Sequence, residues 1–134
     1  MYSSLDLYTD GGSRSNPGPA AIGGVLLEGG KVLAEFSHYI GNATNNIAEY
    51  KALIAGLKLA QGKTENLRVF LDSQLVVRQL NGEYRVKEPH LKPLAKEILS
   101  LIQSYSSATL THVPREENKR ADTLVNKALD AYSG

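Results

Sequence analysis

The segment LRVFLD, residues 67–72, most constrains the fold because it is short and almost wholly apolar. A strand with one solvent-exposed face alternates apolar and polar residues, whereas a strand covered on both faces has a continuous run of apolar residues. We therefore expect this segment to lie inside a sheet that carries helices on both faces. The remaining segments must supply those helices and the neighbouring strands.

Three consecutive strands are predicted in the first third of the chain. The segment SLDLYTD, residues 4–10, contains strand-forming residues and is expected to end at Asp10, because the glycines and prolines of GGSRSNPGP follow it. Residues 20–40 then divide at Gly29-Gly30 into two apolar runs, which is the pattern of a hairpin.

Helical patterns alternate with strands in the rest of the chain. The first helix is expected from about Asn46 to Gln61, with Thr44 or Asn45 as its N-cap and Gly62 as its stop. The later elements are a helix over 73–82 capped by Ser73, a helix over 89–105, a strand over 108–114 and a helix over 118–132. This order predicts an α/β fold, a mixed sheet with helices on both faces, in a single domain over residues 1–134.

The composition excludes several classes of function. The chain of 134 residues has no cysteine, so any metal must bind oxygen or imidazole rather than thiolate. Its 15 basic and 14 acidic residues leave a net charge of +1, so contact with nucleic acid has to come from local geometry. The sequence has no membrane-spanning run and no signal peptide, and we expect a cytoplasmic protein.

One carboxylate lies in the apolar stripe of the first predicted helix. Glu49 shares this stripe with Leu53, Gly56, Leu57 and Ala60, which recur at helical spacing. A buried and unpaired carboxylate costs several kcal/mol or changes its protonation state. Glu49 therefore needs a partner from elsewhere in the chain or from a bound ion.

Three further carboxylates are expected to meet Glu49. Asp10 and Asp72 each end a predicted strand, and Asp122 shares the apolar face of the last helix with Tyr132. If the first and fourth strands are parallel neighbours, these groups meet at the strand ends where open α/β sheets bind ligands. Four like charges repel, and Mg²⁺, Mn²⁺ or Ca²⁺ would resolve that repulsion. Each residue alone also fits an ordinary role, as a turn former, a helix-start charge or a solvated residue.

Four motifs in order resemble the type 1 ribonucleases H: TDGGSRSNPGPAAIG, TNNIAEYKALIAGL, LDSQLVVRQLNG and HVPREENKRADTLVNKA. The resemblance covers essentially the whole chain. It implies a ribonuclease-H-like fold with a five-stranded mixed sheet in the order 3-2-1-4-5. It also implies endonucleolytic cleavage of the RNA strand of RNA–DNA hybrids, which leaves 5′-phosphate and 3′-hydroxyl ends.

The resemblance assigns the four carboxylates to two Mg²⁺ ions, for which Mn²⁺ is a substitute. Asp10 would bridge both ions, Asp122 would hold the ion that activates water, and Glu49 with Asp72 would hold the ion at the leaving oxygen. It likewise assigns a set of polar residues to the nucleic acid. These are Ser13, Ser15, Asn16, Asn46 and Gln74 in the groove, Asn45 beside them, and Thr44 with Asn46 at a phosphate of the DNA strand.

The chain departs from the family pattern in three places. Its loop VPREEN lacks the histidine that assists product release in many relatives, and Arg115 aligns nearest to that catalytic role, while His112 is expected in the preceding strand. The basic protrusion is reduced to a segment with Arg85, Lys87 and Lys92, so we expect weaker substrate binding. The chain also begins almost directly with its first strand, so no accessory hybrid-binding domain is expected.

The sequence therefore predicts a monomeric, cytoplasmic hydrolase whose partner is an RNA–DNA hybrid, with no membrane and no obligate protein partner. Two other interpretations stay open at this point. One is a nuclease of related fold that cuts double-stranded RNA or DNA junctions. The other is a nucleic-acid-binding module that has lost catalysis.

Overall fold

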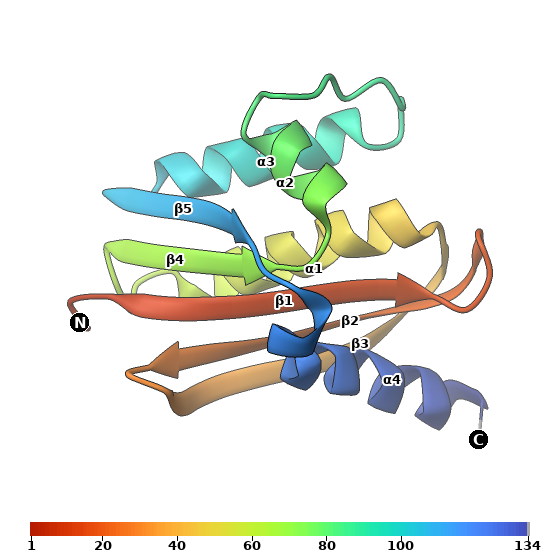
Figure 1. Cartoon of the computed structure of the whole chain (residues 1–134), viewed down its shortest axis with the longest axis horizontal. Helices are drawn as coiled ribbons and strands as arrows, with labels where there is room; N and C mark the ends of the chain where they lie inside the picture. The colour runs from red at the N-terminus through yellow and green to blue at the C-terminus, as the bar shows by residue number, and fades with distance from the viewer. Residues whose placement is uncertain (134) are drawn as a thin grey trace.

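A five-stranded mixed sheet forms the centre of the computed structural model, which describes residues 1–133 (Figure 1). Gly134, the last residue of the predicted domain, lies outside the described residues. In chain order the elements are β1 (Leu5–Ser13), β2 (Gly18–Glu28), β3 (Lys31–Ala43), α1 (Asn45–Ala60), β4 (Asn66–Leu71), α2 (Gln74–Leu80), α3 (Lys92–Gln103), β5 (Ser107–His112), the 3₁₀ helix η1 (Arg115–Glu117) and α4 (Lys119–Ser133). The strand order is β3-β2-β1-β4-β5, as the family resemblance implies.

The two kinds of strand pairing divide the sheet in two. β1 pairs antiparallel with β2, and β2 with β3, while β4 is parallel to both β1 and β5. The hairpin between β2 and β3 turns at Gly29 and Gly30, which both have positive φ. The first and fourth strands are therefore parallel neighbours, which is the condition under which Asp10 and Asp72 were expected to meet.

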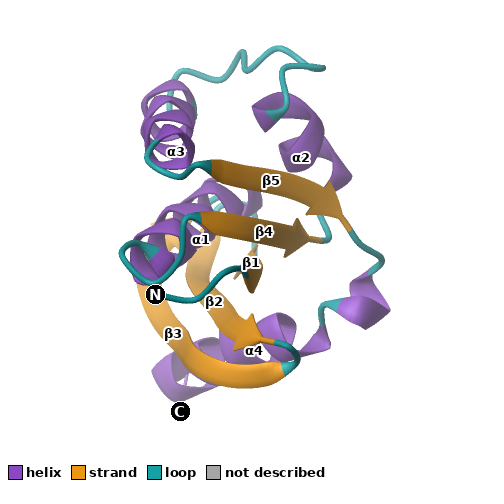
Figure 2. Ribbon diagram, turned by 90° about the vertical axis from the view of Figure 1, so that its left-hand side faces the viewer, coloured by secondary structure: helices purple, strands orange, loops and turns teal. Residues whose placement is uncertain are grey.

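Helices cover both faces of the sheet (Figure 2). α1 lies on one face, where Leu53 and Leu57 join Leu7 and Val69 in the main core, to which α2 and α3 also contribute. α4 lies on the other face and forms a smaller core around Val125 with β2. Within residues 1–133, no helix is both long and apolar enough to cross a membrane.

Local side-chain hydrogen bonds begin two of the helices. The hydroxyl of Thr44 accepts from the backbone N–H of Ile47 at 3.2 Å, so Thr44 is the N-cap of α1 and Asn45 is its first residue. The hydroxyl of Ser73 accepts from Val76 N–H at 3.3 Å at the start of α2. Both caps satisfy N–H groups that have no partner inside the helix.

The sequence predicts that β1 ends at Asp10, but the strand continues to Ser13. The reason is nonlocal, because β2 pairs with the Gly11-Gly12-Ser13 segment as far as the Ser13–Ala20 pair. The parallel ladder with β4 stops earlier, at Tyr8 and Phe70. Asp10 therefore lies where β1 is still paired on one side and has separated from β4 on the other.

Two other expectations are corrected. Residues Arg115–Glu117 form the single turn η1 rather than an irregular loop, and Asn118 N–H closes it by donating to Arg115 C=O at 2.9 Å. Tyr132, expected on the apolar face of α4, is 57% exposed, and its ring stacks on Tyr39 at 4.0 Å between centroids. α4 passes beyond the edge of its small core at this point, so the aromatic pair lies at the surface.

Gly11 allows α1 to approach β1 closely. A Cβ atom on Gly11 would lie 2.3 Å from the carbonyl carbon and oxygen of Ala48, which are backbone atoms of α1. A Cβ on neighbouring Gly12 would meet the Val125 side chain at 3.5 Å, an ordinary contact. The backbone of the helix therefore excludes any side chain at Gly11 but not at Gly12.

We predict that Gly11→Ala lowers the free energy of unfolding by about 3 kcal/mol, because rigid backbone rather than a movable side chain must give way. Gly12→Ala is the matched control and should change it by less than about 1 kcal/mol. Urea unfolding of both variants in chelator measures the difference. Equal stabilities would show that α1 is free to shift away from β1.

Candidate active site

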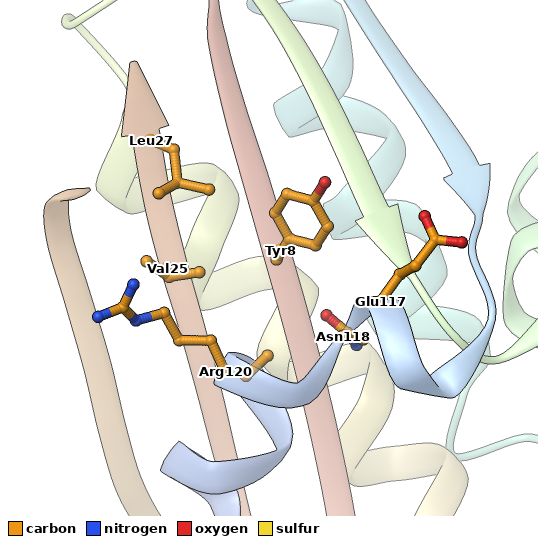
Figure 3. Close-up of a pocket in the computed structure, with 7 residues that line it drawn as sticks. Tyr8, Val25, Leu27, Glu117, Asn118 and Arg120 are labelled. Atoms are coloured by element: carbon orange, nitrogen blue, oxygen red, sulfur yellow. The ribbon is translucent and has the colours of Figure 1, made fainter. Parts of the chain in front are cut away.

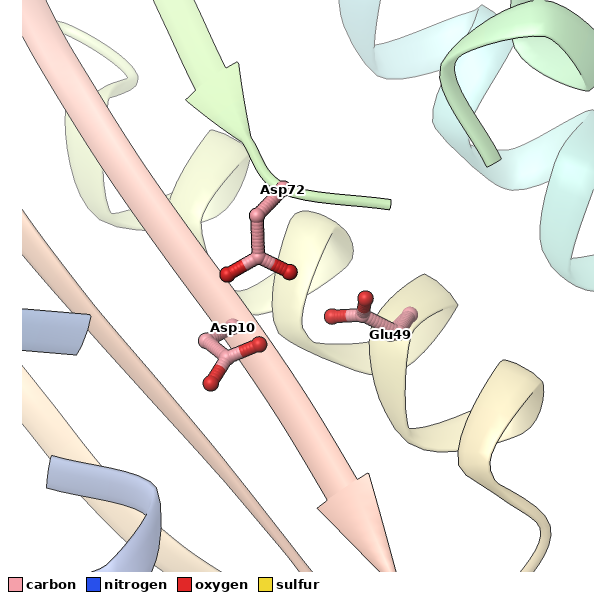
Figure 4. Close-up of side chains that lie close together, drawn as sticks. All are labelled: Asp10, Glu49 and Asp72. Carbon is pink, nitrogen blue, oxygen red and sulfur yellow. The ribbon is translucent and has the colours of Figure 1, made fainter. Parts of the chain in front are cut away.

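Three carboxylates from different elements converge at the end of the β1–β4 ladder (Figure 4). Asp10 comes from β1, Glu49 from α1 and Asp72 from the residue that follows β4. One oxygen of each side chain lies within 4.8 Å of the others. We call this group the carboxylate triad.

Glu49 is held in the triad by the backbone of β1. Gly11 N–H donates to Glu49 Oε1 at 2.7 Å, and the Glu49 side chain is buried. The close approach that Gly11 permits is therefore also what places the helical carboxylate beside Asp10. The position of Glu49 in the apolar stripe of α1, noted in the sequence, places it against the sheet.

Asp122 joins the triad from the opposite face of the sheet. It lies in the first turn of α4, half-buried, and shares with the triad a hollow of about 200 Å³. We call this the acidic hollow. The structure thus brings all four predicted carboxylates to one place, with Asp122 beside Asp10 rather than within the triad itself.

Burial and mutual repulsion raise the pKa values of two carboxyl groups in the cluster, Asp10 and Glu49. Burial, followed by the charges of Asp72 and Asp122, raises the pKa of Asp10 to about 7. Burial and the charge of Asp10 raise the pKa of Glu49 well above its ordinary range, while the hydrogen bond from Gly11 N–H opposes that rise. Without positive charge, the cluster therefore resists full ionisation near neutral pH.

The donor set fits a divalent cation that prefers oxygen. Two oxygens that bind one ion at 2.0–2.6 Å lie at most about 4–5 Å apart, and the triad oxygens meet this condition. The four side chains offer carboxylate oxygen alone, which suits hard cations better than zinc or copper. A cation would also supply the positive charge that the raised pKa values call for.

Two of the predicted nucleic-acid contacts line the acidic hollow, Ser13 and Asn45. Asn45 Oδ1 accepts from Ser13 N–H at 3.2 Å, and Asn45 N–H donates to Asn16 Oδ1 at 3.0 Å. Asn45 therefore ties the end of β1 to the following turn and to α1. Thr44, beside it, uses its hydroxyl as the N-cap of α1.

The other predicted contacts lie outside the lining of the acidic hollow. Ser15 is exposed and donates its hydroxyl to Pro17 C=O at 3.1 Å, within the turn after β1. Asn46 is half-buried in the first turn of α1, and Gln74 is exposed as the first residue of α2, two residues after Asp72.

The cationic residues named in the sequence analysis occupy two separate regions. Arg115, in η1, lines the acidic hollow, as its alignment with the family histidine predicts, whereas His112 is exposed at the end of β5. Arg85 and Lys87 are exposed in the irregular segment between α2 and α3, and Lys92 begins α3. Figure 1 shows this segment arching beyond α2 and α3.

Three polar residues near the carboxylates were missed from the sequence. Arg14 lines the hollow and forms an ion pair with Asp130 of α4. Asn126 Nδ2 donates to Asp122 Oδ2 at 3.4 Å, one helical turn along α4. Asn118 Nδ2 donates to Asp72 Oδ2 at 3.1 Å. The signal for the two asparagines is their spacing of four residues on either side of Asp122.

A family described as reverse transcriptase-like matches residues 8–128 of the chain. The chain is 46% identical over 125 residues to ribonuclease HI of Halobacterium salinarum, which covers 92% of this chain and 63% of that protein. It is 47% identical to a bifunctional protein of Mycobacterium tuberculosis, over 93% of this chain and 35% of that protein. The chain therefore spans less than two thirds of the length of both curated relatives.

Two solved structures of ribonuclease H1 match over nearly their full length. The crystal structure of RNase H1 from Halobacterium salinarum superposes with a TM-score of 0.93 at 44% identity, covering 96% of this chain and 99% of that one. LC11-RNase H1, solved in complex with an RNA/DNA hybrid, gives a TM-score of 0.92 at 44% identity, covering 97% and 99%. With its fold, its carboxylates and these relatives, the chain belongs to the type 1 ribonuclease H family.

Proposed function

We propose that the chain is an endoribonuclease that hydrolyses the RNA strand of RNA–DNA hybrids with two divalent cations, Mg²⁺ or, as a substitute, Mn²⁺. The observation that carries the proposal is the convergence of three carboxylate oxygens within 4.8 Å, with Asp122 on the same hollow. Carboxylate clusters that hold two metal ions are a recurrent arrangement for phosphodiester chemistry. Membership of the ribonuclease H family supports the choice of substrate.

The structure also offers groups suited to an RNA strand. Ser13 and Asn45 line the acidic hollow beside the carboxylates and carry donors and acceptors of the kind that recognise 2′-hydroxyls. The relative LC11-RNase H1 binds an RNA/DNA hybrid on the same fold. Ser15, Asn16, Asn46 and Gln74 would extend the contact along the groove, and Thr44 would lie near a phosphate of the DNA strand.

The protein's part in the reaction is to hold charge in fixed positions. When bound, the two cations supply a nucleophile at neutral pH and neutralise charge on the phosphate and the leaving oxygen. Asp10 would face both ions, Asp122 the ion on the water side, and Glu49 with Asp72 the ion on the leaving side. The Gly11 N–H fixes the Glu49 carboxylate. Arg115 would hold the phosphate through paired hydrogen bonds.

The proposed activity is tested on one end-labelled sequence presented as hybrid, double-stranded RNA, double-stranded DNA and a DNA junction, with Mg²⁺, Mn²⁺ or chelator. We expect cleavage of the hybrid alone and only with metal. Asp10→Asn should reduce it by at least about a hundredfold, because it removes a charge at the centre of the cluster. Faster cleavage of double-stranded RNA or of the junction would overturn the hybrid assignment. Binding of the hybrid without any cleavage would indicate a non-catalytic module.

Metal-free stability should depend on pH in a direction set by Asp10. Since its pKa is raised to about 7 in the folded state, the folded protein binds a proton that the unfolded chain has released between about pH 4 and 7. This carboxyl therefore lowers stability progressively as pH rises through that window. In chelator at pH 7.5, we expect Asp10→Asn to raise the free energy of unfolding by about 1–3 kcal/mol.

Urea unfolding of parent and Asp10→Asn at pH 5.0 and 7.5 measures this difference, and added Mg²⁺ should stabilise the parent more than the variant. Glu28→Gln, which changes an exposed carboxylate at the end of β2, away from the hollow, is the control for loss of one negative charge. An Asp10→Asn gain no larger at pH 7.5 than at 5.0 would contradict the assigned electrostatics.

Arg115 should affect turnover through the phosphate. We predict that Arg115→Ala slows kcat by about ten- to a hundredfold, the loss expected for one charged hydrogen bond of about 1.5–3 kcal/mol. Arg115→Lys should recover part of the rate, because the charge survives but the paired geometry does not. Steady-state kinetics at saturating hybrid measure the effect, with Arg68→Ala, at an exposed arginine of β4 outside the hollow, as the matched control. Undiminished turnover for Arg115→Ala would make this arginine a solvated surface residue.

A further inference from the structure

We propose that Asn118 is a positioning residue that holds the Asp72 carboxylate in the triad and thereby sets the affinity of the acidic hollow for divalent cations. The inference rests on the proposed metal site and concerns a residue outside the predicted ligand set. Asn118 lies between η1 and α4 and is 1% exposed.

The amide of Asn118 bridges the place where β1 and β4 separate. Its Nδ2 donates to Thr9 C=O at 2.9 Å and to Asp72 Oδ2 at 3.1 Å. The parallel ladder stops one residue before Thr9, so the side chain continues the connection between the two strands after the backbone pairing has ended. The bond to Asp72 limits rotation of a carboxylate that follows the strand and precedes α2.

The backbone of Asn118 fixes two other residues of the hollow. Its N–H donates to Arg115 C=O at 2.9 Å, and its C=O accepts from Asp122 N–H at 3.1 Å. Asn118 therefore hydrogen-bonds the side chain of Asp72 and the backbone of Thr9, the residue before Asp10. It also hydrogen-bonds the backbones of Arg115 and Asp122. A single side chain and its peptide groups join η1 and α4 to the carboxylates.

The orientation of the amide points to a role in the site rather than in stability. Nδ2 faces two acceptors, so a reversed amide would place oxygen against oxygen at both contacts. In this orientation the amide oxygen Oδ1 is buried, and within residues 1–133 it has no hydrogen-bond partner. A buried acceptor without a partner is unfavourable. The folded protein tolerates this cost while it keeps the donor on Asp72.

Figure 3 shows the amide oxygen of Asn118 on the side of Tyr8, in the wall of a second hollow of about 240 Å³. Val25 and Leu27 form its apolar side. None of the four carboxylates lines this hollow. Among residues 1–133, none donates a hydrogen bond to Oδ1 there.

Groups that hydrogen-bond metal ligands commonly change metal affinity or activity by about 10–100-fold when removed. We therefore expect Asn118→Ala to weaken Mn²⁺ binding by about tenfold or more, measured by titration calorimetry without substrate. The Mg²⁺ concentration for half-maximal cleavage should rise by a similar factor. The KM for hybrid at saturating Mg²⁺ should change by less than about threefold, because Asn118 acts through Asp72.

Two further variants separate positioning from packing. Asn118→Leu fills the space without a donor and should show the same loss of Mn²⁺ affinity as Asn118→Ala. Thr64→Val is the matched control, since buried Thr64 also makes two backbone hydrogen bonds, to Tyr2 C=O at 2.9 Å and from Asn66 N–H at 3.1 Å, but at the opposite end of β4. It should lower stability to urea without changing Mn²⁺ affinity.

The outcomes distinguish this inference from the proposed function. If the parent cleaves hybrid and the folded Asn118 variants bind Mn²⁺ as tightly as the parent does, the positioning role alone is overturned. A Thr64→Val variant with an equal loss of Mn²⁺ affinity would do the same, because the effect would then follow from stability. A parent that neither binds Mn²⁺ nor cleaves hybrid would overturn the proposed function and the inference with it.

Discussion

The contact between Gly11 and α1 is the constraint on which the rest of the site depends. The helix approaches so closely that a Cβ on Gly11 would overlap the backbone of Ala48, and the Gly11 N–H reaches Glu49 Oε1 at 2.7 Å. A longer distance would leave Glu49 buried without a donor and too far from Asp10. The close packing of α1 on β1 therefore also assembles the carboxylate triad.

That assembly works against the stability of the metal-free protein. Burial and neighbouring charge raise the pKa values of Asp10 and Glu49, so the folded state holds carboxyl groups that ionise more readily in the unfolded chain. The core on the α1 side, with Leu7, Leu53 and Leu57 fully buried, offsets this cost. Binding of cations would convert the repulsion into affinity, and this is why such a cluster indicates a function.

Sequence patterns located the site well where the signal is local. Glu49 stands out because it interrupts an apolar stripe, and Thr44 and Ser73 are recognisable as caps from the residues that follow them. The extension of β1 to Ser13 was missed because it comes from pairing with β2, which glycines at the end of the strand do not reveal. Asn118 was missed for the same kind of reason: its partners Thr9 and Asp72 are 109 and 46 residues away.

The fold alone would not identify the activity, because many functions share one architecture. The proposed activity rests instead on carboxylates that come from both faces of the sheet. Glu49 belongs to α1 on one face and Asp122 to α4 on the other, and both side chains line the hollow where β1 and β4 separate. η1 and Asn118 lie at the same place, so the residues after β5 bring Arg115 to the acidic hollow together with Asp122. An arginine there can hold a phosphate through paired hydrogen bonds, which is a different role from that of the family histidine. Under the proposed function, this departure from the family pattern would change how the site releases its product, while the carboxylate arrangement stays intact.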